Sequence, residues 1–391
     1  MACYLPEIIV ANILHRLPAK TLLRCTAVSK HWYSLITSPQ FISSHLNFSA
    51  AREDRAVLLR RCVHNSERYD LYKDDHSFAS LRSLEFPFWS INSCFTIVGS
   101  CNGLLCLSDD RVYLTSTIIL WNPCIRRSIR LPNPNLVSNS FGTFIQCLGF
   151  GFDSVSSDYK VIRITYTYCF IGEYPRVELY RLSGGVWEDL SYLRFGYVIH
   201  NRSRQAFVGG AVHWVACLPE GYDLIAVFDL RCETFREIML PDSLMDKEPT
   251  RTKELVVFGG CLTVFLWNVE ESGFVVWMMK EYGVADSWSK HLRFDCHVYG
   301  GGRRVRPLWV TRCGGVVGVW QDGCLVCCYS DGDGDGDGSG MKRLGVKGSR
   351  SEEYRRTVHI DGYVESLVLL NRSSGSDDNG GKNIGRAQRS S

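Results

Sequence analysis

The chain has 391 residues, of which 45% are hydrophobic and 12% aromatic, and its formal net charge at pH 7 is +3. This apolar content is enough for a sizeable core and excludes a mainly disordered protein. The charge is too small to favour nucleic acid or a membrane surface as a partner. The sequence contains no run of 18 apolar residues, so it predicts no membrane span. We also expect no secretory signal at residues 1–20.

The first 46 residues have the spacing of short helices. Pro6 opens one segment and Pro18 separates it from the next, as expected for a residue favoured in the first turn. In "VSKHWYSLI" (28–36), Ser29 is placed to cap a helix that carries Trp32. The apolar positions of the four predicted segments are Ile8, Ile9, Leu14 and Leu17; Leu22, Leu23 and Val28; Trp32, Leu35 and Ile36; and Phe41, Ile42, His45 and Leu46.

A helical unit of this size rarely buries enough apolar surface to be stable alone, so a partner surface is expected. The stretch from Leu5 to Leu46 resembles the F-box, with two Leu-Pro pairs and a Trp followed by Leu-Ile. The resemblance implies a domain at 1–46 that docks on a Skp-family adaptor and, through it, on a cullin scaffold. Trp32 would either lie in that interface or belong to the domain's own core. The residues implied in adaptor binding or its support are Leu5, Pro6, Ile9, Leu17, Pro18, Leu22, Val28, Trp32, Leu35 and Ile36.

Residues 50–370 are instead rich in short β-branched and aromatic runs separated by Gly, Asn-Pro and Ser-Gly turns. Six strand–turn–strand units repeat with anchors 49, 59, 48, 49 and 52 residues apart. A period near 50 predicts four-stranded blades, and six units predict a β-propeller of about six blades. We expect "YVESLVLL" (363–370) to return to the first blade and close the ring. The anchors are Tyr72, Trp121, Tyr180, Phe228, Trp277 and Tyr329.

The same region resembles the F-box-associated interaction domain, a kelch-like domain of a large plant family of F-box proteins. The segments that carry this resemblance are "GSCNGLLCLSD" (99–109), "LWNPCIRRSIRLP" (120–132), "GFGFDSVSSDYKVIRI" (149–164), "GGAVHWVA" (209–216), "VVWMMKEYGVADSWSK" (275–290), "RPLW" (306–309) and "YVESLVLL". It implies a non-catalytic substrate receptor of a ubiquitin ligase, whose β-domain captures an unidentified target protein. A scaffold or decoy without degradation, or a ligand-binding propeller, are the alternatives.

Cysteine is abundant, at 17 residues, an odd number. Without a secretory signal this predicts reduced, buried thiols in the cytoplasm or nucleus, not a disulfide framework. Cys324 and Cys327 form a CxxC pair, but no second pair is near to complete four zinc ligands. We therefore interpret "CLVCCY" as a core strand.

No other motif predicts a metal, a cofactor or catalysis. The "DGDGDGDGSG" run (331–340) alternates Asp and Gly like a calcium loop, but Lys342 stands where an EF-hand needs a bidentate Glu. "GFGFDS" is followed by a strand pattern, whereas a dinucleotide-binding fingerprint opens a helix. Five arginines could line a substrate-binding rim, form a weak nuclear-import patch, or be solvated loop charges: Arg202, Arg204, Arg303, Arg304 and Arg306. The polar tail at 371–391 is expected to be disordered.

Overall fold

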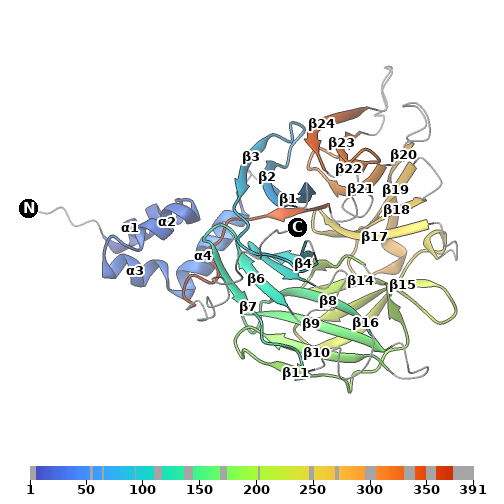
Figure 1. The fold of residues 1–391 in the computed structure, drawn as a ribbon, viewed down its shortest axis with the longest axis horizontal. Coiled ribbons are helices and arrows are strands. Elements are labelled where there is room, and N and C mark those ends of the chain that lie inside the picture. Colours follow the sequence, from blue (N-terminus) through green and yellow to red (C-terminus); the bar gives the residue numbers. More distant parts are fainter. Residues whose placement is uncertain are drawn as a thin grey trace, which may run out of the picture.

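The computed structural model describes residues 6–52, 56–63, 66–92, 94–109, 117–135, 144–167, 174–200, 203–245, 251–268, 273–295, 305–329, 340–348 and 358–372. Within these ranges a small helical unit stands beside a large β-domain (Figure 1). The helices are α1 (Glu7–His15), α2 (Ala19–Cys25), α3 (Lys30–Ile36) and α4 (Pro39–Ala50). None of the described helices is long and apolar enough to span a membrane.

Local sequence determines where these helices begin. The Trp32 N–H donates to Ser29 Oγ at 3.1 Å, which confirms Ser29 as the cap of α3. Ser38 caps α4 in the same way, and Pro39 occupies the first turn, where it costs no hydrogen bond. The apolar positions predicted for the first helix divide between core and surface. Leu14 is buried, but Ile8 and Ile9 at the start of α1 are exposed.

The described strands of the β-domain form six sheets, which confirms a six-bladed propeller. Blade 1 contains β25 (His359–Tyr363), β1 (Ala56–Val63), β2 (Ser66–Lys73) and β3 (Ser80–Leu84). Blade 2 contains β4 (Thr96–Cys101), β5 (Leu104–Ser108), β6 (Ile118–Asn122) and β7 (Arg127–Arg130). Blade 3 contains β8 (Phe144–Asp153), β9 (Asp158–Thr167), β10 (Arg176–Arg181) and β11 (Trp187–Asp189).

Blade 4 contains β12 (Val198–Ile199), β13 (Ala206–Val208), β14 (Ala211–Cys217), β15 (Asp223–Asp229) and β16 (Thr234–Met239). Blade 5 contains β17 (Arg251–Phe258), β18 (Cys261–Asn268), β19 (Gly273–Met279) and β20 (Trp288–Asp295). Blade 6 contains β21 (Val305–Val310), β22 (Val316–Trp320), β23 (Cys324–Cys328) and β24 (Met341–Lys347). Two 3-10 turns complete the elements, at Asp242–Leu244 and Ala285–Ser287.

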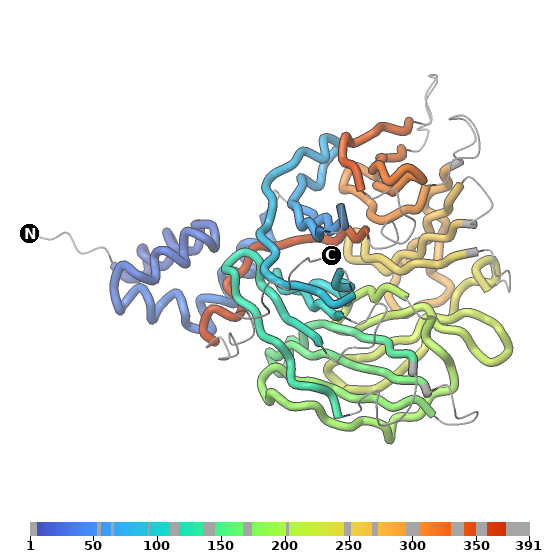
Figure 2. Tube along the Cα trace, in the orientation of Figure 1, coloured from blue at the N-terminus to red at the C-terminus, as the bar shows by residue number. Residues whose placement is uncertain are grey.

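The ring is closed by strand β25, which pairs with β1 so that Tyr363 lies opposite Ala56. Closure by a C-terminal strand is therefore confirmed, but the strand ends where we expected it to begin. Residues 364–370 continue past the sheet to the helical unit (Figure 2). Because β25 covers the inner edge of β1, that edge is not free to pair with another chain.

Ion pairs and polar chains connect neighbouring blades. Lys160 Nζ in blade 3 is buried and donates to Asp153 at 2.9 Å, to Glu233 of the blade 4 hairpin at 2.9 Å, and to the Leu230 carbonyl at 2.6 Å. Its pKa is raised because the hydrogen bonds and charges of these carboxylates outweigh the effect of burial. A buried cation with three acceptors is a strong restraint on the relative position of two blades.

Blades 4 and 5 are joined by a polar chain. Arg236 donates to the Tyr282 hydroxyl at 2.6 Å, and this hydroxyl lies 2.9 Å from His213 Nε2. His213 Nδ1 lies 3.1 Å from the Ala206 carbonyl, so Nδ1 carries the proton and Nε2 accepts from tyrosine. Burial lowers the pKa of His213 to about 4. The neutral imidazole is therefore part of the folded state.

Candidate protein-interaction surface

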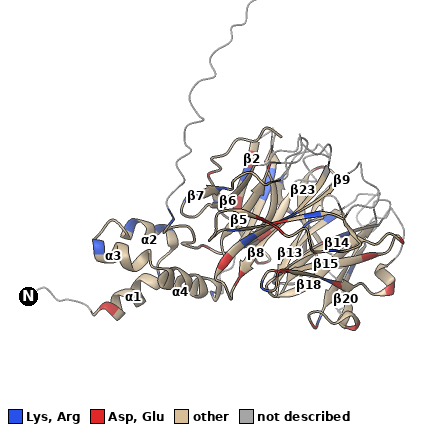
Figure 3. Cartoon of the chain, turned by 90° about the horizontal axis from the view of Figure 1, so that it is seen from below, with Lys and Arg blue, Asp and Glu red and all other residues tan. Residues whose placement is uncertain are grey.

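Several large apolar side chains of the helical unit are exposed to solvent. Five large side chains on α1 and around α3 are exposed, namely Ile8 (71%), Ile9 (42%), Ile13 (47%), Val28 (64%) and Tyr33 (56%). The exposed His31 imidazole lies 3.7 Å from the Glu7 carboxylate, which brings the starts of α1 and α3 together. Glu7 is the only acidic or basic residue of α1 apart from His15, and Figure 3 shows the rest of this helix without charge. We call these five residues the helical apolar face.

The core beneath this face is complete without a partner. Leu14, Leu22 and Ile36 are at most 1% exposed, and Phe41 of α4 stacks on His15 with ring centroids 4.5 Å apart. Continuous packing of this kind fixes the helices relative to one another. The exposed apolar side chains are therefore not needed to hold the unit together.

The structure divides the predicted adaptor residues into three groups. Leu22 and Ile36 lie in the core, where they support the surface. Leu17, Trp32 and Leu35 are half-buried and pack against that core, so Trp32 is part of the core and part of the surface. The exposed members are Pro6, Ile9, Pro18 and Val28, whereas Leu5 lies outside the described residues.

The adaptor-binding residues predicted from the sequence did not include Ile8, Ile13 or Tyr33, which the structure places on the surface. The available signal was the excess of apolar residues in "EIIVANIL", which is more than one helical stripe can bury. Tyr33 follows Trp32 directly and therefore points away from the side that Trp32 covers.

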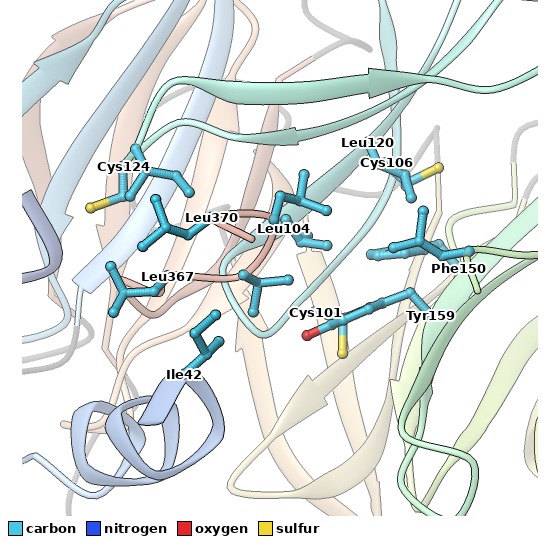
Figure 4. Close-up of a cluster of buried hydrophobic side chains, with 14 of the residues drawn as sticks. Ile42, Cys101, Leu104, Cys106, Leu120, Cys124, Phe150, Tyr159, Leu367 and Leu370 are labelled. Carbon is cyan, nitrogen blue, oxygen red and sulfur yellow. The ribbon is translucent and has the colours of Figure 1, made fainter. Parts of the chain in front are cut away.

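The helical unit and the propeller share one hydrophobic core. Ile42 of α4 faces Leu367 and Leu370, and these two lie between α4 and Leu104 and Cys124 of blade 2 (Figure 4). All five side chains are buried. The residues after β25 therefore form a layer between the two domains, which we call the junction segment (residues 364–370).

Polar groups of blade 2 hold the junction segment. Asn122 is fully buried, and its Nδ2 donates to the carbonyls of Ser366 at 3.0 Å and Val368 at 2.9 Å. Its Oδ1 accepts from the Cys124 N–H at 3.0 Å. Gly103 has φ +77°, and a Cβ there would lie 2.4 Å from the Val364 carbonyl. The Asn-Gly turn and the Trp-Asn-Pro turn thus act as a clamp.

Side chains at both ends of the junction segment add ion pairs and hydrogen bonds. Arg82 of β3 donates to the Glu365 carboxylate at 2.7 Å. Arg372 Nη1 donates to the Leu182 carbonyl of blade 3 at 2.7 Å. Blades 1, 2 and 3 therefore all contact this stretch of chain, which limits how far the helical unit can swing.

The axis of the propeller holds a cavity of about 580 Å³. Residues of β4, β17, β21 and β25 line it, together with Arg204 and Gln205 before β13. Gln205 donates to the Phe150 carbonyl at 2.7 Å and accepts from the Phe150 N–H at 2.5 Å, so its amide acts as an extra β-bridge to blade 3. Its side chain fills the space beside Gly99, where a Cβ would collide with it.

The structure describes two of the five arginines predicted as a possible substrate-binding rim. Arg204 lines the axial cavity and donates to the Val358 carbonyl; burial and the nearby Arg306 lower its pKa to about 10. Arg306 lies within β21 and pairs with Glu254 at 2.6 Å. The interpretation as solvated loop charge is wrong for both residues. Arg202, Arg303, Arg304 and the Asp331–Asp337 run lie outside the described residues.

The CxxC pair belongs to β23, which confirms the predicted strand. Cys327 and Cys328 are buried, and burial raises the pKa of the Cys327 thiol. Among the described residues no group of three or more His, Cys, Asp or Glu side chains is placed to hold a metal ion. All 14 described cysteines are free thiols.

A small helical domain with exposed apolar side chains, fixed to a closed β-propeller, defines a two-domain protein. The sequence profile of the F-box domain matches residues 3–44, and that of the F-box associated beta propeller domain matches residues 55–368. The chain therefore belongs to the family of F-box proteins with an F-box associated β-propeller.

Three relatives from Arabidopsis thaliana are similar to this chain over most of its length. F-box protein CPR1 is 32% identical over 307 residues, which cover 73% of this chain and 72% of the relative. F-box protein At3g07870 is 30% identical, over 79% of this chain and 77% of the relative. F-box/kelch-repeat protein At3g23880 is 27% identical, over 78% of this chain and 83% of the relative.

Proposed function

We propose that this protein is the target-recognition subunit of a Skp–cullin–F-box ubiquitin ligase and performs no chemistry itself. The observation that carries the proposal is the helical apolar face, which stays exposed although the core beneath it is complete. Exposed apolar patches on a folded protein mark interaction sites. The partner on this face is a Skp-family adaptor, which links the chain to a cullin scaffold.

The propeller holds the target protein in this proposal. The junction segment fixes the propeller to the helices through Asn122, Gly103 and Leu367. A target bound to the propeller would then be held at a defined distance and direction from the adaptor. Tethering of this kind raises the effective concentration of target lysines at the conjugating enzyme.

Adaptor binding is tested with Ile9→Ser combined with Val28→Ser, since both side chains are exposed and neither supports the core. We expect the purified adaptor to bind the double variant at least 30-fold more weakly, because interface hot spots contribute 2 kcal/mol or more. Phe48→Ser is the matched control, since Phe48 is 41% exposed on α4, outside the helical apolar face. Unchanged adaptor affinity of the double variant would contradict the assignment.

Target turnover separates the receptor from a non-degradative scaffold. A receptor shortens the half-life of its bound protein only while the cullin is active, whereas a scaffold leaves the half-life unchanged. We further propose that the protein acts in the cytoplasm or nucleus. The free thiols of the described cysteines support this location, because reduced cysteines are typical of those compartments.

A further inference from the structure

The segment between β3 and β4 presents two large apolar side chains to solvent. Phe86 and Phe88 of this segment point inward and pack on Trp121, with ring centroids 5.4 and 5.8 Å apart. Trp89 is 81% exposed and Ile91 is 60% exposed, although both follow directly on this aromatic cluster. Trp89 has the highest exposed fraction among the large hydrophobic side chains that the structure describes.

The exposure of Trp89 does not come from a loose loop. Asp109, which is 3% exposed, accepts from Ser90 Oγ at 2.7 Å and from the Ile91 N–H at 3.1 Å. Asn92 Nδ2 donates to the Asp109 carbonyl at 2.9 Å and to its carboxylate at 3.0 Å. The backbone on the C-terminal side of Trp89 is thus held in place before any partner arrives. A fixed surface loses little conformational entropy on binding.

A positive charge lies on the same end of blade 2. Asp109 donates its N–H to the Thr117 carbonyl at 3.1 Å, and Arg130 Nη2 donates to Thr117 Oγ1 at 2.8 Å. Arg130 is exposed at the end of β7. Arg130 thus lies at the same end of blade 2 as Asp109, the residue that holds Ser90 and Ile91 in place.

This surface lies away from the helical unit. Strand β5 begins at Leu104, which belongs to the core shared with α4, and ends at Ser108, next to Asp109. Five residues of strand span roughly 16 Å. A protein bound at Trp89 therefore occupies the opposite end of blade 2 from the helices and leaves the helical apolar face accessible.

We propose that Trp89, Ile91 and Arg130 form a docking surface for the target protein, which presents an apolar groove bordered by a carboxylate. This inference rests on the proposed receptor function. Tryptophan and arginine are the residues most enriched among interface hot spots, and a carboxylate complements the guanidinium of Arg130. A second copy docking through the same surface would bring two Arg130 side chains together across the two-fold axis, which disfavours that occupant.

The partner is identified by photo-crosslinking in cells of the organism that makes this protein. The full chain carries p-benzoylphenylalanine in place of Trp89. The matched control carries the same group in place of Tyr192, which is 69% exposed in blade 3. We expect one protein to crosslink at position 89 and not at position 192. A crosslink only to a second copy of the chain, or no crosslink specific to position 89, would overturn the docking surface.

The identified protein is then purified and its affinity measured for the full chain bound to its adaptor. We expect Trp89→Ala to weaken binding at least tenfold and Trp89→Phe to weaken it less, with no change in melting temperature for either variant. Binding of Trp89→Ala within twofold of the unmodified chain would refute the proposal. If affinity depends on Trp89 but the partner's half-life is independent of cullin activity, the docking surface stands and the receptor function fails.

Discussion

Replacing Asn122 with alanine should release the junction segment while the propeller stays folded. The change removes both donors to the Ser366 and Val368 carbonyls and the acceptor of the Cys124 N–H. Each buried polar group left without a partner costs about 1–3 kcal/mol. The three groups together should therefore cost about 3 kcal/mol or more, unless the segment opens and lets water reach them.

Hydrogen–deuterium exchange read by mass spectrometry measures this opening directly. A cost of about 3 kcal/mol corresponds to a loss of protection of roughly 100-fold in residues 364–370. Exchange in α4 should rise as well, because Ile42 packs on Leu367. Strands of blades 4 and 5 should keep their protection.

Asn92→Ala is the matched control for this experiment. Asn92 is also a buried asparagine with two hydrogen bonds from its amide, but it contacts Asp109 at the other end of blade 2. It should leave residues 364–370 protected. The reasoning is refuted if Asn122→Ala leaves the junction segment as protected as in the unmodified chain, or if both variants expose it equally.

Three further changes probe stability by urea unfolding or segment exchange. Gly103→Ala should expose the junction segment, because its Cβ would meet the Val364 carbonyl; unchanged exchange would contradict the clamp. Lys160→Met should lower the free energy of unfolding by about 3–5 kcal/mol, because the buried Asp153 carboxylate loses its cation while Glu233 keeps only Arg181. Arg126→Ala, in an exposed ion pair, should lower it by under about 1 kcal/mol. Acidification from pH 7 to 5 should lower the free energy of unfolding by about 2 kcal/mol, because the folded chain keeps His213 neutral. Its pKa of about 4 lies below the ordinary 6.5, so the unfolded chain binds a proton first, and stability falls as pH drops below 6.5. His213→Asn should reduce this pH dependence, and an unchanged dependence would exclude His213 as its source.

The repeat in the sequence located the blades because five of the six anchors have the same structural place, and the sixth, Tyr329, directly follows β23, the third strand of blade 6. Trp121, Tyr180, Phe228 and Trp277 lie in the third strand of their sheets, counted from the axis, and Tyr72 lies in the third strand of blade 1 once β25 is counted first. A third strand is covered on both faces by neighbouring blades, so it selects large apolar side chains. A local packing demand that recurs in each blade is visible as a period in the sequence.

Features that depend on contacts between distant segments were not predictable in this way. "YVESLVLL" has the apolar content of a strand, but its leucines do not belong to a sheet. They pack between α4 and blade 2. Arg306 was read as a loop charge because its partner, Glu254, lies in another blade. Ile8 and Ile9 fit a helical pattern, yet the pattern does not say which apolar residues a second protein would cover. Each of these three features can be predicted only when the tertiary arrangement of the chain is known.

The position of β25 and the junction segment has a consequence for biosynthesis. Strand β1 ends at Val63 and must wait for β25, which begins at His359, before its inner edge is paired. At typical translation speeds this takes on the order of 15–60 s. The same late residues brace the helices against blade 2. A chain stopped short of residue 359 would thus carry the helical apolar face, the proposed adaptor-binding site, on an open, unbraced propeller. It could compete for the adaptor without presenting a target in a fixed position, so early termination would produce an inhibitor of the complex instead of a merely absent subunit.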